Sequence, residues 1–425
     1  MRERIRRQVT SHMLWEYPQL ALIVVGVFVV FLGLTSIWPV LTLYMQGEGI
    51  GLTEISLVTS AFMAANFLFQ VPAGWASDRL GRKPLLVGGL LVHVATSLLY
   101  LGAHGSWEFG ALRFIEGIAA AANMPAARAY IMDTVPAARR GQAFGLLGAA
   151  FNGGMMFGPA IGGFLGGFTG MAGPFWFGAI TSLVAGGWLA IKMQGGKPVQ
   201  HAEETAEMPA GAPVAIRIPW RAIAPLFVSM IGWGFVGGFF SVVWNIWIHD
   251  LGGDLNVIGF SYTLFALPMV LVGPWGGRLA DRYSRPLLIL IPSLVAAAIY
   301  FAYGFITSIP VILALGVIEG AMIAILDPAS ASYMADVLPP TLRGRLQGAI
   351  STTNTGMGFI GTLICGPLYM IGPIYLFTLL AGLHAVSAGI ASSLMWPQER
   401  RLRAQQAATV AAREGAVPTL KAEAA

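Results

Sequence analysis

Five ionisable residues lie inside long apolar stretches of the sequence, where a charge needs a partner or a function. They are Arg113, Glu116, Arg128, Glu319 and Asp327. A charge in the middle of a bilayer is costly, so such residues usually pair or line an ion or substrate pathway. Three acids accompany only two arginines, and burial disfavours the charged form of a carboxylate. We therefore expect a proton-binding site or, equally, a site for a cationic substrate.

The spacing of these residues indicates pairs. Arg113 and Glu116 are three residues apart and can pair along one helix. Arg128 lies roughly 18 Å from Glu116 at 1.5 Å per residue, near the end of its stretch, where a long side chain reaches the interface. The side chain of Asp327 is too short to reach the interface. It would meet Arg128 across a cavity if both of their helices line it.

The elements that must position these residues are membrane helices. Of 425 residues, 56% are hydrophobic and only 11% are charged, against about 25% charged in soluble proteins. Twelve stretches are long enough to cross a bilayer, which takes about 17–25 residues. We expect spans near 18–45, 54–77, 85–104, 107–132, 141–168, 171–192, 219–248, 256–279, 287–307, 309–334, 345–370 and 373–396. The sequence thus predicts an all-α integral membrane protein with twelve transmembrane helices.

Basic residues mark one side of the membrane. Of the 25 Lys and Arg, 23 fall in one set of alternating segments, and the opposite loops hold none. Because basic residues stay in cytoplasmic loops, we expect a multi-pass protein of the plasma (inner) membrane with both termini in the cytoplasm. This topology accounts for the net charge of +5, so we expect no nucleic-acid partner.

The two halves of the sequence repeat each other. A shift of 203 residues superposes Glu116 on Glu319 and Asp133 on Asp336 without a gap. Repeated halves are typical of transporters whose site lies between them. We predict two six-helix bundles at 1–192 and 219–396, a cytoplasmic linker at 193–218 and a cytoplasmic tail at 397–425.

The repeat also ranks the acids. Met124 occupies the position symmetric to Asp327, so Asp327 is specific to one half and is our first choice for the proton site. Glu116 is the second choice. Glu116 and Glu319 are duplicated, so a structural hydrogen-bonding role is the alternative for both.

Three motifs resemble those of the major facilitator superfamily. Residues 74–83 resemble its loop 2–3 motif, and residues 113–117 resemble its span 4 motif. A third pattern is similar to the span 5 motif of the superfamily's drug/proton antiporter branch, and it consists of Gly154, Gly158, Pro159, Gly162 and Gly163. The resemblance covers all twelve spans. It implies the major facilitator fold and a secondary transporter that exports hydrophobic or cationic small molecules by proton-coupled alternating access.

Charges at the cytoplasmic mouth are expected to act as a gate. The motif begins at Gly74, and its Asp78 and Arg82 share a helical face. Arg82 would pair with Asp133, and Asp78 would meet the positive start of span 11. Such contacts would latch the halves when this side is closed. Alternatively, the charges only enforce topology. The symmetric set is Asp281, Arg285 and Asp336.

The span 5 glycines are expected to let another helix approach closely, while Pro159 removes one backbone hydrogen bond and permits a bend. Packing without a mechanistic role is the alternative. Spans 1 and 7 supply Trp38, Phe235, Trp244 and Asn245 as candidates for a substrate cavity, because aromatic walls suit hydrophobic or cationic molecules. For these aromatic residues, ordinary membrane packing is the alternative.

Signs of an enzyme are missing from the sequence. It has no phosphate-binding loop, nucleophile elbow or His-Glu-x-x-His metal helix, so we expect no cofactor and no metal. His93 and His384 fall on spans 3 and 12, where a satisfied structural role is expected. The second functional hypothesis is a metabolite transporter or lipid flippase in which Arg113 and Arg128 hold an anionic head group. A membrane sensor is the third, and we expect a monomer.

Overall fold

The structure is a computed structural model that describes residues 13–136, 139–194, 220–338 and 340–422. Most of the predicted linker at 193–218 lies outside the described residues. All secondary structure in the described ranges is helical, as the apolar stretches predict.

The first half of the chain contains the first six predicted spans. The first span bends at Ile37, just before Pro39, and so consists of two helices. A short helix precedes it at the start of the described chain. The helices are α2 (Met13–Glu16), α3 (Pro18–Ser36), α4 (Trp38–Gly47), α5 (Leu52–Leu80), α6 (Arg82–Tyr100), α7 (Ser106–Thr134), α8 (Arg140–Thr169) and α9 (Gly173–Lys192).

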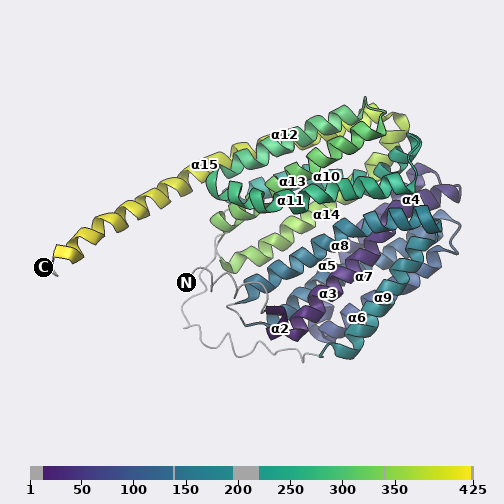
Figure 1. Ribbon diagram of the computed structural model, residues 1–425, viewed down its shortest axis with the longest axis horizontal. Helices are drawn as coiled ribbons and strands as arrows, with labels where there is room; N and C mark the ends of the chain where they lie inside the picture. The colour runs from purple at the N-terminus through teal and green to yellow at the C-terminus, as the bar shows by residue number, and fades with distance from the viewer. Residues whose placement is uncertain (1–12, 137–138, 195–219, 339, 423–425) are drawn as a thin grey trace.

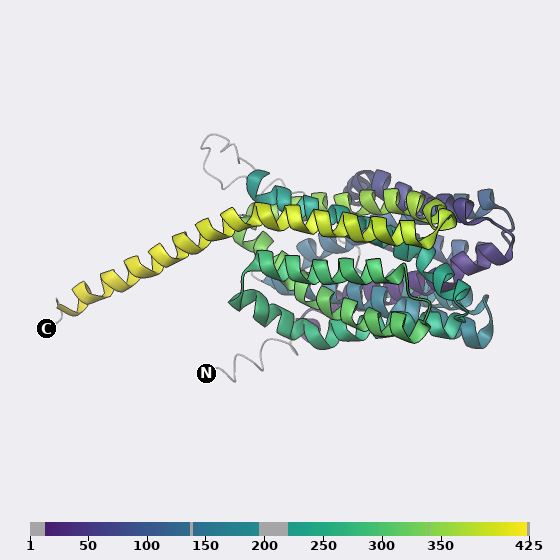
Figure 2. The ribbon, with the colours of Figure 1, turned by 90° about the horizontal axis from the view of Figure 1, so that it is seen from above.

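The second half contains the other six spans, and its last helix extends far beyond the others (Figures 1 and 2). The residues predicted as a tail from 397 thus continue the last helix to Ala422. The helices are α10 (Trp220–Asp250), α11 (Leu255–Arg282), α12 (Arg285–Tyr303), α13 (Ile309–Val337), α14 (Pro340–Ile371) and α15 (Pro373–Ala422).

Ten helices of the described chain, with α3 and α4 taken as one, are long and apolar enough to cross a membrane. The other two predicted spans correspond to α7 and α14. Their composition is more polar, because α7 carries the membrane arginines and α14 carries the run Ser351 to Thr355. The all-α membrane fold is confirmed.

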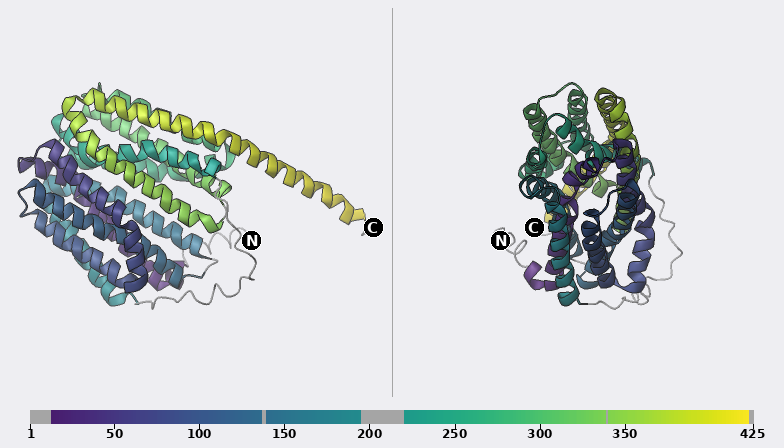
Figure 3. Two further views of the ribbon diagram at one scale, coloured as in Figure 1. Left: turned by 180° about the vertical axis from the view of Figure 1, so that it is seen from behind. Right: turned by 90° about the vertical axis from the view of Figure 1, so that its right-hand side faces the viewer.

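The long helices run side by side along the longest axis of the molecule (Figures 1 and 3). Helices α3 to α9 pack among themselves, as do α10 to α15, and the two groups meet through α8 with α11, α5 with α14, and α4 with α10. The domain boundaries that we assigned stay a prediction.

The two ends of this bundle differ in charge. The end that we call the basic end carries Arg82 at the start of α6, Arg140 at the start of α8, Lys192 at the end of α9 and Arg285 at the start of α12. At the opposite end, the loops between the helices contain no Lys or Arg.

Candidate functional site

A buried charge cluster joins α6 and α7 in the first half. Arg113 Nη1 donates to Glu116 Oε2 over 2.8 Å, so the predicted pair is present. His93 Nδ1 lies 2.8 Å from Glu116 Oε1, and the Tyr100 hydroxyl donates to Oε2 over 3.0 Å. Arg113 also lies over the Phe62 ring. The Glu116 carboxylate thus has a cationic partner and two further polar partners.

The symmetric acid in the second half has different surroundings. Glu319 is buried on α13 and accepts a 2.6 Å hydrogen bond from the Tyr300 hydroxyl. The 203-residue shift places Gly316 at the position of Arg113 and Ala296 at that of His93. Glu319 Oε2 has no hydrogen-bond partner in the described part of the chain. The repeat has therefore kept the acid and lost both basic partners.

His384 lies close to this second acid. Its ring packs edge-on against Tyr300 and Trp233, and it is buried beside the backbone of Gly232. Among the described residues, neither ring nitrogen has a hydrogen-bond partner of good geometry. The expectation of a satisfied histidine is therefore wrong for His384, since its neighbours on α10 and α12 are aromatic rings. His93 is satisfied by Glu116 at one nitrogen only.

Asp327 and Arg128 are both exposed. At about 100° per residue, Arg128 lies about 60° around α7 from Arg113, and Asp327 lies about 20° around α13 from Gly316. Arg128 thus lies on the face of α7 that carries Arg113, and Asp327 lies on the equivalent face of α13. The ion pairs of the described chain do not include Arg128 with Asp327, so the two do not meet in this conformation.

At the basic end, Arg82 holds two acids. It lies 2.6 Å from Asp78 and 3.2 Å from Asp133, and the side chains of Arg82 and Asp133 are each only 9% exposed. Asp78 is 66% exposed. Gly74, one turn earlier, has open space where a Cβ would lie, so close packing does not require it.

The second half repeats this arrangement in part. Arg285 Nη2 lies 3.1 Å from Asp336, as Arg82 does from Asp133. Asp281, the counterpart of Asp78, is exposed.

The span 5 glycines form two contacts on α8. Gly154, Gly158 and Gly162 face the backbone of α3, where a Cβ would meet Phe28, Leu32 or Ser36. Gly163 faces Gly259 of α11, in the other half. The expected close approach of helices is present, and Pro159 lies buried within α8.

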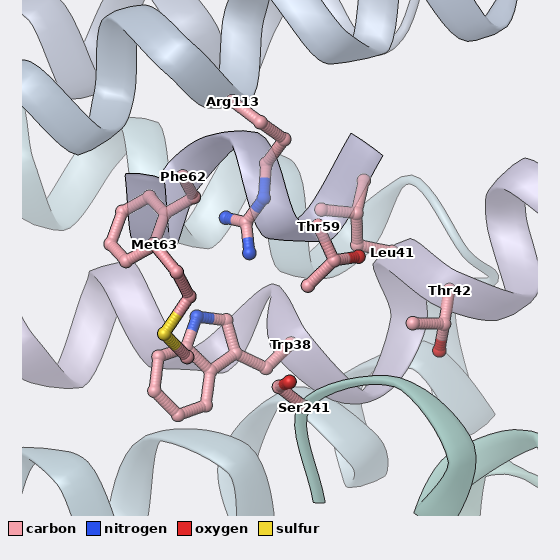
Figure 4. Close-up of a pocket in the computed structure, with 8 residues that line it drawn as sticks. All are labelled: Trp38, Leu41, Thr42, Thr59, Phe62, Met63, Arg113 and Ser241. Atoms are coloured by element: carbon pink, nitrogen blue, oxygen red, sulfur yellow. The ribbon is translucent and has the colours of Figure 1, made fainter. Parts of the chain in front are cut away.

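A small cavity of about 20 Å³ lies where α4, α5 and α7 meet α10 (Figure 4). Trp38, Phe62, Met63 and Arg113 line it, and Figure 4 shows the Arg113 guanidinium and the Trp38 indole on its wall. Its volume fits one water-sized group. Three of its buried polar atoms lack a hydrogen-bond partner within the described ranges: Arg113 Nε, Trp38 Nε1 and Thr59 Oγ1.

Of the four predicted cavity residues, only Trp38 lines this space. Phe235 and Trp244 are 3% and 4% exposed and do not line it, so their place in a substrate cavity stays a prediction. Trp244 donates to Ser261 over 3.0 Å and packs on Tyr303 and on aromatic residues of its own helix.

Asn245 instead joins the two halves near the end opposite the basic end. Its side-chain amide donates to the Trp38 carbonyl over 3.2 Å and accepts from the Tyr262 hydroxyl over 3.0 Å. Closer to the basic end, Thr352 on α14 donates to Gln70 on α5. Together with the contact of Gly163, these bonds hold the halves together at the opposite end and through the middle.

Sequence reasoning missed His93, Tyr100 and Tyr300 as partners of the buried acids. They lie 16 to 23 residues away from those acids on neighbouring helices, where no local spacing indicates a contact. The 203-residue repeat gives a signal for Tyr100 alone, which corresponds to Tyr303, whereas His93 corresponds to Ala296 and Tyr300 to Ser97.

Known proteins with similar sequences include drug-resistance proteins. The chain is 25% identical over 386 residues to multidrug resistance protein 2 of Bacillus subtilis, with 88% of this chain and 94% of that protein covered. It is 22% identical over 371 residues to quinolone resistance protein NorA of Staphylococcus aureus, with 84% and 92% covered.

The fold matches that of solved transporters. A D-xylose-proton symporter superposes with a TM-score of 0.72 at 14% identity, covering 89% of this chain and 97% of that one. The sequence profile of the Major Facilitator Superfamily matches residues 23–244 and 226–422, nearly the whole described chain. The protein therefore belongs to the Major Facilitator Superfamily.

Proposed function

We propose that this transporter exports hydrophobic or cationic small molecules and is driven by protons. The observation that carries the proposal is the contrast between the two buried acids. Glu116 is neutralised by Arg113, whereas Glu319 has only a tyrosine hydroxyl among its described hydrogen-bond partners. Resistance proteins among the relatives support export.

Protons would act at Glu319 and Asp327, both on α13. Ionised Glu319 is costly because burial leaves its charge without a counter-ion. Asp327 lies eight residues further along the helix, about 12 Å at 1.5 Å per residue, and is exposed. We assign Asp327 as the proton entry site and Glu319 as the buried site. The network of Glu116, Arg113 and His93 then takes no part in proton transfer.

We propose that the basic end is cytoplasmic in the plasma membrane, because basic residues favour that side. The conformation described here is then closed to the outside. The exposure of Asp78, Arg128 and Asp327 fits a cavity that opens towards the cytoplasm.

The small cavity is the proposed contact point for substrate at the closed end of this pathway. Phe62, Met63 and Trp38 offer apolar surface, and the unsatisfied atoms of Arg113, Trp38 and Thr59 offer hydrogen bonds. Two of those three groups are pure donors. This favours a second candidate function, the transport of molecules that carry an anionic or carbonyl group.

Substrate-driven proton movement tests these proposals. Proteoliposomes that contain a pH indicator receive a hydrophobic quaternary ammonium dye or an organic anion of similar size. We expect the cation to stimulate proton flux in a manner that requires the protein. Stimulation by the anion alone would favour the second candidate, and a proton flux that neither compound changes would exclude proton coupling to these substrates.

The charges around Arg82 are proposed to set the balance between the two conformations. The pairs of Arg82 lie within the first half and are already formed in the conformation described here, so the link between the halves would be the contact of the exposed Asp78 with the start of α14 when the basic end closes. Asp78→Asn should therefore favour the state that is open at the basic end, by a graded amount, because a surface contact of this kind contributes about 0.2–1 kcal/mol. Arg82→Glu should have a larger effect, because it places a second acid beside the buried Asp133. Spin-label distances across the basic end would measure the shift. If both variants keep wild-type distances and transport, these charges act only in topology.

A further inference from the structure

A groove on the outer surface of the first half lies away from the substrate pathway. It runs between α2, α3 and α9 at the basic end and has a volume of about 620 Å³, within the range of about 300–1,000 Å³ that is usual for ligand pockets. Its wall consists mainly of Trp15, Pro18, Leu22, Val25 and Trp188, and Lys192 lies at one end.

The groove faces the surroundings of the protein. Trp15 is 86% exposed, and Val25 and Trp188 are also partly exposed. Along α9, Ile180 and Ile191 continue the same exposed apolar surface. In a membrane protein such a surface lies against lipid chains.

The cation at the end of the groove has no acidic partner within the described residues. Lys192 is exposed, and the ion pairs of the described chain give it no acidic partner. The nearest acid on α2, Glu16, is paired with Arg139. The groove therefore joins a cation that has no ion-pair partner in the described ranges to an apolar channel.

The floor of the groove is fixed by hydrogen bonds. Gln19 on α3 donates to the Lys192 carbonyl over 3.2 Å and accepts from the Tyr130 hydroxyl over 2.8 Å and from the Gln194 backbone over 3.2 Å. These bonds tie α3, α7 and the end of α9 together, so the groove keeps its shape without a ligand.

We propose that the groove binds one anionic glycerophospholipid from the leaflet at the basic end. Lys192 would hold the phosphate and head group, and the indoles of Trp15 and Trp188 would lie at the level of the interface, as membrane tryptophans do. From Pro18 to Val25 the groove follows α3 for about 10 Å at 1.5 Å per residue, and the upper part of an acyl chain would lie there. This inference does not rest on the transported substrate.

Lipid titration of the purified full-length protein, followed by native mass spectrometry, tests the site. The probes are phosphatidylglycerol, phosphatidylcholine with the same chains, and soluble glycerol phosphate. We expect phosphatidylglycerol to bind most tightly. Lys192→Gln should weaken it about fivefold, the equivalent of the ~1 kcal/mol that one lysine contributes near an anionic surface, and should leave phosphatidylcholine unchanged.

Two further variants complete the test. Val25→Trp fills the groove and should weaken both lipids while the charge remains. Arg221→Gln removes an exposed cation at the start of α10, outside the groove, and should change nothing. Equal binding of the two lipids to the wild type, or an unchanged preference in Lys192→Gln, would overturn the proposal. Binding of soluble glycerol phosphate as tight as that of phosphatidylglycerol would also overturn it.

Discussion

Asp327→Asn is expected to abolish uphill transport while substrate binding and downhill exchange persist. The amide copies the size and most hydrogen bonds of the protonated acid but cannot release a proton. Glu319→Gln should do the same, because the amide can still accept the hydrogen bond from Tyr300. Accumulation of a labelled substrate in proteoliposomes, with and without a pH gradient, measures both effects.

Glu116→Gln should behave differently from these two variants. It leaves Arg113 buried without its counter-ion, and breaking a buried pair in this way costs about 3–5 kcal/mol. We expect a lower melting temperature and poor expression. The exposed Glu54 at the start of α5 provides a control, since Glu54→Gln should alter neither property. If Asp327→Asn and Glu319→Gln both still accumulate substrate with wild-type pH dependence, the coupling role of α13 is wrong.

Gly163→Leu is expected to prevent closure of the opposite end. A Cβ at this position would meet the backbone of Gly259 and the carbonyl of Leu255, which cannot move as a flexible side chain can. Overpacking of such a contact costs about 1–3 kcal/mol, equivalent to about 5- to 150-fold in the balance between conformations. Spin labels at Thr169 and Phe305, both exposed at that end, would report a longer distance, and transport should fall by a similar factor.

Gly148→Leu is the matched control on the same helix, because nothing lies within 4 Å of a Cβ at this position. The reciprocal variant Gly259→Leu should reproduce the effect of Gly163→Leu. A closed-state distance in both Gly163→Leu and Gly259→Leu would show that α8 and α11 need not meet so closely.

Local features of this protein were predictable from sequence. The twelve spans follow from apolar length, and the pairs of Arg113 with Glu116 and of Arg82 with Asp133 follow from helical spacing and the repeat. The row of small residues on α8 predicted close helix contacts, and these are present.

Contacts between helices far apart in sequence were harder to predict. The hydrogen bond of His93 to Glu116 depends on how α6 packs on α7. The burial of Phe235 and Trp244 depends on which face of α10 turns towards the neighbouring helices. An apolar membrane helix has little amphipathic pattern, so its sequence does not indicate that rotation.

The paired and unpaired acids also differ in their response to the membrane voltage. In the first half, Arg113 and Glu116 cancel each other, so movement of that half carries no net charge from this pair through the electric field. In our proposal the acids of α13 alternate between neutral and negative, so the second half would carry that charge. One elementary charge moved across 100 mV is worth about 2.3 kcal/mol, and this electrical work would fall on the acids of α13 and not on the pair of Arg113 with Glu116.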